Sequence, residues 1–512
     1  MKHTKKLVSL LLALVMVFAL AVSVSAATVT MPTNGILKDH TYTAYQVFAG
    51  REENGILSDV TWGSGISSDA FLAALKADTT YGSLFTDCTD AAAVAKVLGA
   101  NNTNEALANA VAELAYANKT GDGTALTSGA NTLDDGYYLI VDTTENVAAG
   151  SAYNKALLQV VGNINIAVKT DAPTVDKTVT NNDNTTGNAA DYSIGDAVPF
   201  TLIGSVPDMS RYDTYKYIFH DTLSAGFDAP ETSAVKVYLS NDGTYDTSDA
   251  DVTASFEIEV VDHTITISCN NLKTISNIAK GQFVIVKYEA TLNSSAVIGG
   301  TGNPNTVFLE YSNKPDQSGS GDNNTGNTPE DKVFVFTYEL DVTKVDGQDN
   351  TKLAGAEFKL RTTDNKWVTV DTNGKVTGWV GSETAGSTLT TDANGLVKII
   401  GLDAGTYYLK ETKAPVGYNT LKDEIKIVIT AELTQTEDAA ALNTLKISVD
   451  NGEAKDGSIT TGIVATDVKN NKGATLPETG GMGTTLFYAI GGILVLAAVV
   501  LFVTKRRMSA EK

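Results

Sequence analysis

The chain has 512 residues, which is too long for one compact core, and we expect about three domains. Its net charge of −22 argues against a nucleic-acid partner and predicts a well-solvated body. The two cysteines, Cys88 and Cys269, lie far apart in different expected domains, so no disulfide is expected to stabilise the chain.

The N-terminus has the order of a secretory signal peptide. Lys2, Lys5 and Lys6 precede an apolar run over 7–24, and small residues follow it. This order predicts cleavage after Ala26 and export of the rest of the chain. An exported protein of this size without disulfides needs another source of rigidity.

The exported region predicts mainly β-sandwich domains. Short runs rich in Val, Ile, Thr, Tyr and Phe alternate with clusters of Gly, Asn and Asp. Helical spacing occurs only over 70–76 and 91–117. Turn-forming or linker-like sequence at 170–173 and 315–330 marks two expected boundaries. The expected segments are a signal peptide at 1–26, an N-terminal domain with some helix at 27–170, a middle sandwich at 171–330, a further sandwich at 331–471 and a C-terminal signal at 472–512.

Polar residues interrupt the apolar face of three predicted strands in the middle domain. Side chains alternate between faces along a strand, so Lys177 lies on the apolar face of its strand. The same alternation places Asp221 and Asn305 on apolar faces. Burying a lone charge is costly, so we expect these three groups to meet. Asn303 has the same parity as Asn305, and alternation alone leaves both open.

The domain at 331–471 repeats this arrangement. Lys344, Glu411 and Asn470 each lie on the apolar, inward face of a predicted strand. Burial disfavours charged groups, so a neutral lysine amine could attack the Asn470 carboxamide while a protonated Glu411 polarises its oxygen. Asn471 is the nearest rival to Asn470, but parity points it outward.

The C-terminus combines a pentapeptide, an apolar run and a basic tail. The apolar run over 486–503 is long enough to cross a bilayer, and the basic residues at 505–507 place the tail in the cytoplasm. The pentapeptide before the run is Leu476-Pro477-Glu478-Thr479-Gly480.

This ending resembles the sorting signal that sortases recognise. The resemblance implies that a cysteine transpeptidase cuts between Thr479 and Gly480, holds the Thr479 carbonyl as a thioester and passes it to an amine. Pro477 presets an extended bend, and Gly480 leaves the scissile bond uncrowded. Insertion of 486–503 in the membrane would then be transient.

The region 331–471 also resembles the CnaB-type domains of Gram-positive surface proteins. The resemblance rests on 340–346, 353–358, 407–415 and 468–470, of which the third is similar to that family's E-box. It implies an isopeptide bond between a lysine and an asparagine, promoted by an acid. The implied residues are Lys344, Asn470 and the acid Glu411.

The middle domain fits the pattern of backbone pilins with an aspartate as the acid, which implies a Lys177–Asn305 bond assisted by Asp221. In the N-terminal domain a segment weakly similar to the E-box contains only Asp142 as a candidate acid. Asp142 lies one residue after the position equivalent to Glu411 and so on the other face of its strand. No crosslink is therefore expected within 27–170.

Lys169 follows an apolar face formed by Ile164, Ile166 and Val168, and alternation leaves it exposed. In backbone pilins the lysine at this place accepts the threonine carbonyl of the next subunit. The sequence Ala167-Val168-Lys169 departs from the usual Tyr-Pro-Lys ending, so an ordinary exposed lysine remains the alternative.

The chain as a whole resembles a sortase-assembled major (backbone) pilin of a Gram-positive cell wall. The resemblance implies head-to-tail polymerisation from Thr479 to Lys169 and attachment to peptidoglycan, with adhesion following from display. The implied partners are sortase, further copies of the chain and peptidoglycan, with accessory pilins and host or bacterial surface ligands as further candidates. A monomeric wall-anchored adhesin and a minor basal pilin remain alternatives.

The sequence contains no motif that predicts an enzyme, a cofactor or a metal site. Zinc-ligand spacing, a Gly-x-Ser-x-Gly elbow and a phosphate-binding loop are all missing. The acidic stretch over 241–251 lacks the order of a calcium loop and is interpreted as a solvated turn. A secreted hydrolase would need an acid pair or a histidine site in 27–170, and the sequence indicates neither.

Overall fold

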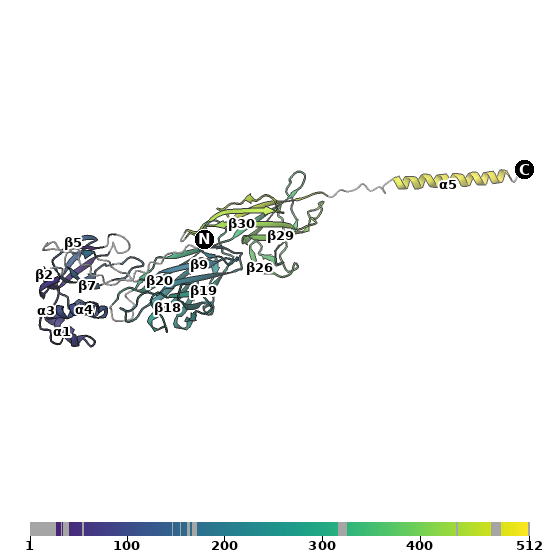
Figure 1. The fold of residues 1–512 in the computed structure, drawn as a ribbon. Helices are drawn as coiled ribbons and strands as arrows, with labels where there is room; N and C mark the ends of the chain where they lie inside the picture. The colour runs from purple at the N-terminus through teal and green to yellow at the C-terminus, as the bar shows by residue number, and fades with distance from the viewer. Residues whose placement is uncertain are drawn as a thin grey trace.

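The computed structural model describes residues 27–31, 33, 40–53, 56–145, 147–153, 155–160, 164–165, 172–315, 325–436, 439–472 and 483–509. The signal peptide, Lys169 and the pentapeptide 476–480 lie outside the described residues. Figure 1 shows three domains in a row, with the helix α5 (Gly483–Met508) beyond the third. The prediction of mainly β sandwiches with helix in the N-terminal domain is confirmed.

The N-terminal domain combines two sheets with four helices. Its elements are β1 (Ala27–Met31), β2 (Tyr42–Glu53), β3 (Ile56–Trp62), α1 (Ser68–Ala77), α2 (Gly82–Phe85), α3 (Ala91–Ala100), α4 (Glu105–Ala117), β4 (Thr124–Leu126), β5 (Gly129–Leu133), β6 (Gly136–Asp142), β7 (Lys155–Val160) and β8 (Ile164–Asn165). One sheet has the order β3-β2-β6-β7 with β4 beside β2, and the other has the order β5-β1-β8. The predicted helix over 91–117 is divided, because Asn104 begins α4 by accepting a hydrogen bond from the Leu107 amide at 3.0 Å.

The middle domain is a sandwich of two seven-stranded sheets. Its strands are β9 (Val175–Thr180), β10 (Thr186–Gly187), β11 (Ala189–Asp191), β12 (Ala197–Ser205), β13 (Tyr217–Leu223), β14 (Phe227–Asp228), β15 (Lys236–Ser240), β16 (Ala250–Asp251), β17 (Glu257–Val261), β18 (Thr264–Cys269), β19 (Phe283–Leu292), β20 (Asn303–Ser312), β21 (Thr325–Asn327) and β22 (Asp331–Phe336), and its 3-10 turns are η2 (Thr232–Ala234), η3 (Thr253–Ser255) and η4 (Leu272–Thr274). One sheet runs β10-β9-β12-β19-β15-β16 with β14 beside β19, and the other runs β11-β22-β20-β13-β18-β17 with β21 beside β20. Alternate residues of both sheets point inward and form the core.

The structure differs from the expected boundary between the middle and third domains. Strand β22 pairs antiparallel with β20 and parallel with β11, so 331–336 complete the middle sandwich. The Gly/Ser/Asn/Asp-rich stretch 315–330 is therefore a connection inside one sheet. The described end of this stretch contains β21, which pairs antiparallel with β20, so composition does not tell whether the chain after a polar stretch returns to the same sheet.

The third domain packs a three-stranded sheet against an eight-stranded sheet. Its strands are β23 (Tyr338–Asp346), β24 (Glu357–Thr362), β25 (Trp367–Val370), β26 (Val376–Val380), β27 (Leu389–Thr390), β28 (Leu396–Leu402), β29 (Gly405–Lys413), β30 (Ile425–Leu433), β31 (Leu442–Val449), β32 (Lys455–Asp456) and β33 (Ile463–Asn470). The small sheet has the order β28-β23-β33, in which the first and last strands of the domain run parallel. The large sheet has the order β26-β25-β24-β29-β30-β31-β32, with β27 beside β24.

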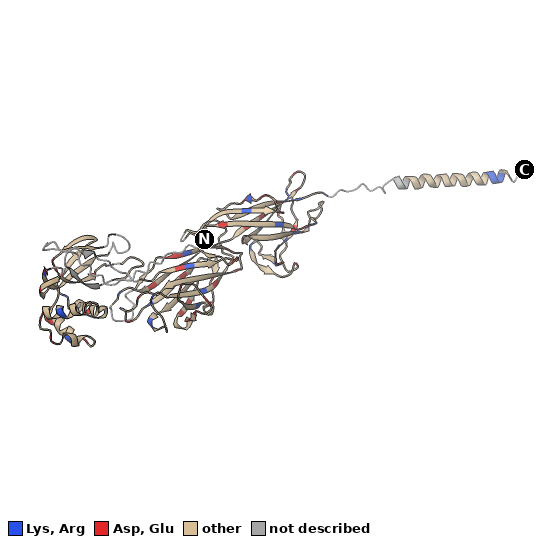
Figure 2. Cartoon of the chain, viewed as in Figure 1, with Lys and Arg blue, Asp and Glu red and all other residues tan. Residues whose placement is uncertain are grey.

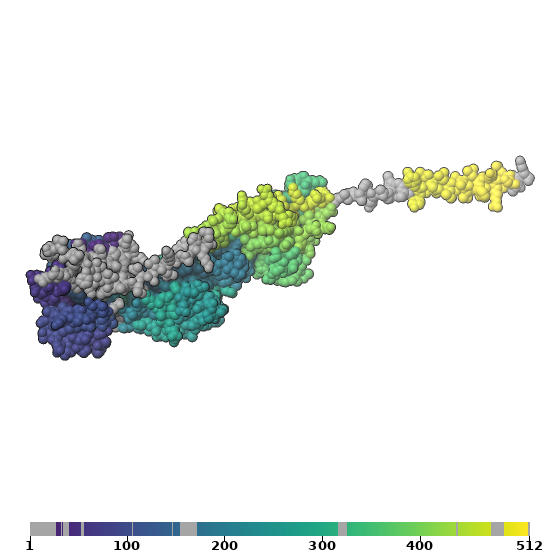
Figure 3. All heavy atoms as spheres, in the orientation of Figure 1, coloured from purple at the N-terminus to yellow at the C-terminus, as the bar shows by residue number. Residues whose placement is uncertain are grey.

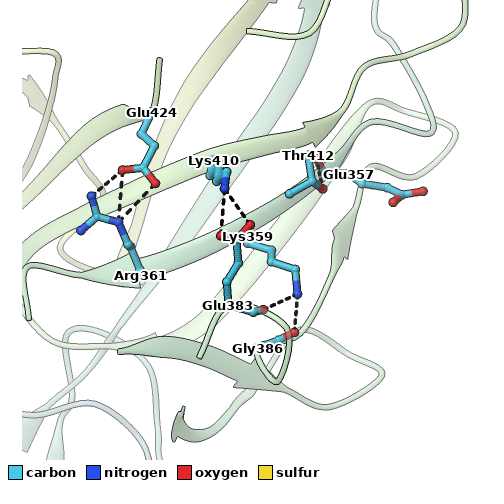
Figure 4. A network of polar contacts seen from close by, with 8 residues as sticks. All are labelled: Glu357, Lys359, Arg361, Glu383, Gly386, Lys410, Thr412 and Glu424. Carbon is cyan, nitrogen blue, oxygen red and sulfur yellow. Dashed lines mark hydrogen bonds and ion pairs between the residues drawn. The ribbon is translucent and has the colours of Figure 1, made fainter. Parts of the chain in front are cut away.

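The outward face of the large sheet carries charged side chains that are paired. Figure 4 shows the Lys410 ammonium group against the Glu383 carboxylate, with both contacts at 2.8 Å. It also shows the Arg361 guanidinium group against the Glu424 carboxylate. Lys410 is thus outward and paired at the surface, whereas its neighbour Glu411 points into the core.

The middle and third domains share one continuous core and are in direct contact where they meet along the row (Figure 3). The Gln435 side chain joins them, because its Oε1 accepts hydrogen bonds from the backbone amides of Asn188 at 2.8 Å and Ala189 at 2.9 Å. The N-terminal domain has separate apolar clusters and meets the middle domain through backbone contacts such as Gly150 N to Asn327 O at 2.8 Å. The joint between the second and third domains is thus the more rigid one.

Three carboxylates gather at the joint between the middle and third domains. Burial raises the pKa of Asp191 to about 6, and burial together with the charge of Asp403 raises that of Asp196 to about 6. Burial also raises the pKa of Asp403, although Tyr407 and Ser193 donate hydrogen bonds to it. Each group holds a proton more tightly in the folded than in the unfolded chain.

The stability that these groups contribute should be fully present below about pH 4 and should be lost as the pH rises through about 6. We expect Asp191→Asn to reduce this loss by up to about 3 kcal/mol. Thermal unfolding of both proteins between pH 4.5 and 7.5 measures the difference, with the exposed Asp456→Asn as the control. An unchanged pH dependence in Asp191→Asn would contradict the prediction.

The C-terminal helix α5 agrees with the predicted membrane span. Its segment Leu486–Met508 contains an 18-residue stretch with a mean hydropathy of 2.8, none of which is buried, so its length and composition suit a bilayer. Figure 2 shows Lys and Arg gathered at the end of this helix, where Lys505, Arg506 and Arg507 occupy its last turn. This is the charge arrangement of a cytoplasmic membrane border.

Candidate crosslinking sites

The third domain brings Lys344, Glu411 and Asn470 together in its core. Lys344 lies on β23 and Asn470 on β33, and the parallel pairing sets Asp346 opposite Asn470. Lys344 Nζ lies 2.5 Å from Asn470 Oδ1 and 3.2 Å from Glu411 Oε1. Asn470 Nδ2 donates to the two Glu411 oxygens at 3.0 and 3.2 Å. The nucleophile, the carboxamide and the acid are therefore in mutual contact.

This site is screened from water. Lys344 and Asn470 are 0% exposed and Glu411 is 5% exposed. Burial lowers the pKa of Lys344, and the nearby Glu411 charge opposes this effect. A lowered pKa favours the neutral amine, which is the form that can attack a carboxamide.

The structure separates Asn470 from its rival Asn471. The Asn471 side chain is exposed, and its backbone oxygen accepts a hydrogen bond from the Asn419 amide at 3.1 Å. Of these two asparagines, Asn470 is the one whose carboxamide makes hydrogen bonds with Lys344 and Glu411.

The middle domain brings together Lys177 from one sheet and Asp221 and Asn305 from the other. Lys177 Nζ donates to Asp221 Oδ1 at 2.6 Å, and all three residues are 0% exposed. The hydroxyl of Tyr288, on β19, donates to Asp221 Oδ2 and accepts a hydrogen bond from Asn305 Nδ2 at 2.7 Å. Asn305 Oδ1 is buried and has no hydrogen-bond partner in the described structure.

Burial lowers the pKa of Lys177, while the charges of Asp221 and Asp331 oppose this effect. Asp331 also accepts a hydrogen bond from the Lys177 backbone amide at 2.5 Å. Because Asp331 begins β22, the return of this strand to the middle sandwich helps to fix Lys177 in its position.

The structure also distinguishes Asn305 from Asn303, which alternation left open. The Asn303 carboxamide is fully occupied by the backbone: Oδ1 accepts from Val297 N at 2.8 Å, and Nδ2 donates to the oxygens of Val297 and Val335 at 3.0 and 3.1 Å. Its role is therefore to hold a loop, and Asn305 is the carboxamide adjacent to the Lys177 site.

Sequence reasoning missed two groups of polar residues. Tyr288 alternates with buried Val284 and Val286, so it resembles an ordinary core aromatic in the sequence. In the N-terminal domain, His40 Nδ1 lies 2.6 Å from Asp142 Oδ2, and Ser151 Oγ lies 2.8 Å from His40 Nε2.

The serine contacts the histidine and the histidine contacts the aspartate, as in the catalytic triad of a hydrolase. The sequence did not indicate a histidine site in 27–170. Ser151 is 0% exposed and His40 is 4% exposed, so a substrate cannot reach the serine in this structure. The Ser151 carbonyl accepts a hydrogen bond from the Tyr311 hydroxyl at 2.8 Å, which ties the group to the middle domain. The three side chains are thus a buried polar cluster of the N-terminal domain, beside a backbone contact with the middle domain.

Three families of known proteins match separate pieces that together make up about half of the chain. Residues 194–315 match the family described as Gram-positive pilin backbone subunit 2, Cna-B-like domain. Residues 338–441 match a prealbumin-like fold domain, and residues 468–509 match the LPXTG cell wall anchor motif. The second match begins where β23 begins, which agrees with the boundary seen in the structure.

Individual relatives are similar to this chain over more than one domain. The chain is 24% identical over 425 residues to the trypsin-resistant surface T6 protein of Streptococcus pyogenes serotype M6, covering 71% of this chain and 73% of the relative. The solved T6 backbone pilin of serotype M6 Streptococcus pyogenes is 18% identical, with 89% of this chain and 100% of that chain covered and a TM-score of 0.50. A pilus 2b backbone protein of group B streptococcus is 25% identical, with 59% and 99% covered and a TM-score of 0.41.

The similarity to the solved T6 backbone pilin supports only the fold. The relationship to pilins rests on the matches to the pilin backbone domain and the anchor motif. Backbone pilins are structural proteins rather than enzymes, and the anchor motif supports the action of a sortase on this chain. The chain is homologous to the backbone pilins of sortase-assembled pili and carries the anchor of a surface pilus protein of a Gram-positive cell wall.

Proposed function

We propose that this chain is the backbone subunit of a covalent pilus, joined head to tail from Thr479 of one copy to Lys169 of the next. The observation that carries this proposal is the anchor motif in a chain that also matches a pilin backbone domain and is similar over 425 residues to the surface T6 protein. The last copy would be joined to peptidoglycan. Adhesion to host or bacterial surfaces, and contact with accessory pilins, would follow from display.

The experiment is the extraction of cell walls from the wild-type bacterium, followed by detection of this chain on a denaturing gel. We expect a ladder of high-mass species, because amide bonds between subunits survive boiling in detergent. A single monomer-sized species would show instead a monomeric adhesin or a basal subunit.

We also propose that the chain forms two internal isopeptide bonds, Lys344–Asn470 and Lys177–Asn305. Glu411 and Asp221 would promote them by exchanging protons with the lysine and the carboxamide, so the only chemistry of the chain would be self-directed. The contacts at 2.5 and 3.2 Å around Lys344 support the first bond, and the buried cluster around Lys177 supports the second.

The mass of the chain tests both bonds. Each amide forms with loss of ammonia, so we expect intact mass to be about 34 Da below that calculated for the exported sequence, about 17 Da for each bond. Glu411→Gln should restore about half of this deficit. A wild-type mass without any deficit would refute both bonds.

A further inference from the structure

The two candidate sites differ in the group that faces the departing nitrogen. In the third domain the Glu411 carboxylate contacts both Lys344 Nζ and Asn470 Nδ2. In the middle domain the acid is Asp221, whose side chain is one methylene shorter. Asp221 contacts Lys177 Nζ but makes no hydrogen bond with Asn305 in the described structure. A hydroxyl occupies the intervening position.

That hydroxyl belongs to Tyr288, which is in hydrogen-bond contact with every other member of the site. It donates to Asp221 Oδ2, accepts from Asn305 Nδ2 at 2.7 Å and lies 3.4 Å from Lys177 Nζ. A phenol has one proton to donate, and this proton is directed to the carboxylate. The carboxamide must therefore present its nitrogen, a donor, to the phenol oxygen.

The surroundings of Tyr288 suit a group that passes protons without becoming charged. Burial, with the Asp221 charge, raises the pKa of Tyr288 well above its ordinary value. The hydroxyl therefore gives up a proton only as it receives another. The Phe200 ring, whose centroid is 5.5 Å from that of Tyr288, forms part of the apolar wall.

We propose that Tyr288 is a catalytic residue of the middle domain's crosslinking reaction and relays a proton from Asp221 to the nitrogen of Asn305 as ammonia leaves. The inference rests on the proposed Lys177–Asn305 bond. In this proposal Tyr288 and Asp221 together deliver the proton to the departing nitrogen, which Glu411, with its longer side chain, does alone in the third domain.

The steps balance without any outside reactant. The Lys177 ammonium group gives a proton to the Asp221 carboxylate, and the neutral amine attacks the Asn305 carbonyl carbon. Asp221 passes its proton to the Tyr288 oxygen while the Tyr288 proton moves to the Asn305 nitrogen. The carbon–nitrogen bond then breaks and ammonia leaves. The new amide nitrogen returns its extra proton to Asp221, so Tyr288 ends as it began.

The experiment follows formation of the bond in the full chain. Cell-free synthesis is stopped at intervals, the chain is digested, and the crosslinked peptide containing Lys177 and Asn305 is quantified by mass spectrometry. We expect Tyr288→Phe to slow its appearance by at least about tenfold, as for loss of a positioned general acid. The third-domain crosslink in the same molecules should form at the wild-type rate, since Asn470 Nδ2 donates directly to the Glu411 carboxylate.

Tyr217→Phe is the matched control. Tyr217 is a fully buried tyrosine of the same sandwich, and its hydroxyl donates to the Ser205 carbonyl at 2.9 Å, away from the site. We expect this variant to form the Lys177 bond within about twofold of the wild-type rate, since it keeps the general acid. Formation in Tyr288→Phe at the wild-type rate would overturn the relay.

Two further comparisons distinguish a wrong bond assignment from a disrupted core. If the wild-type chain never forms the Lys177–Asn305 peptide, the proposed bond itself is refuted.

Asp221→Asn is the reference for a middle domain without the bond. Tyr288→Phe that has not yet formed the bond should unfold at the same temperature as Asp221→Asn. A much lower unfolding temperature would show that the slow reaction comes from a disrupted core, and the relay would be rejected.

Discussion

Replacing Asn470 with alanine should lower the free energy of unfolding of the third domain by about 4–5 kcal/mol, because the proposed bond closes a loop of more than a hundred residues. Lys344 and Asn470 are 126 positions apart, so the constraint on the unfolded chain is large. For a domain of this size we expect the unfolding temperature to fall by about 10–20 °C. Calorimetry of the full chain measures this shift.

Two variants make the Asn470→Ala result interpretable. Asn471→Ala removes an exposed carboxamide at the next position and should leave both mass and unfolding temperature unchanged. Glu411→Gln keeps the size of the side chain but has no carboxyl group to exchange protons. The variant should therefore fail to form the bond and should lose most of the stability that the bond contributes. Equal unfolding temperatures for the wild type, Asn470→Ala and Glu411→Gln would contradict the bond.

Replacing Lys169 with alanine should abolish the high-mass ladder and leave the chain at the mass of a single wall-linked subunit. Without this amine, the thioester at Thr479 can be resolved only by other amines, including those of the wall. Denaturing gels of wall extracts, probed for this chain, measure the change.

Lys96→Ala is the control for this experiment, because Lys96 is an exposed lysine on α3 of the same domain. It should leave the ladder intact. Thr479→Ala should remove both the ladder and the wall-linked monomer, since the carbonyl for transfer is then changed. A ladder that persists in Lys169→Ala would show that another lysine accepts the subunit.

Much of the candidate chemistry could be predicted from the alternation of side chains. Lys177, Asp221 and Asn305 interrupt apolar faces, and the structure buries all three. The reason is physical: a charged group on an inward face must find partners, so its position in the sequence already indicates a cluster. The same reasoning located Lys344, Glu411 and Asn470.

Other features depend on contacts that the sequence does not encode locally. Tyr288 has the spacing of a core aromatic, and only the fold places its hydroxyl between Asp221 and Asn305. His40 and Ser151 are 111 positions apart and meet across the domain. The return of β22 to the middle sandwich depends on pairing with β20, and the polar sequence before β22 does not indicate that pairing.

The parallel pairing of β23 and β33 determines how the third domain would carry tension. A pull along the fibre enters at the start of β23, near Tyr338, and leaves past the end of β33, near Asn470. With the proposed bond in place, the load crosses from Lys344 to Asn470 through covalent bonds alone. The residues between them, which form the whole eight-stranded sheet, are then outside the path of the force. Apart from the inward residues that build the site, above all Glu411 on β29, that sheet and its surface loops are then free to vary in sequence without weakening the fibre.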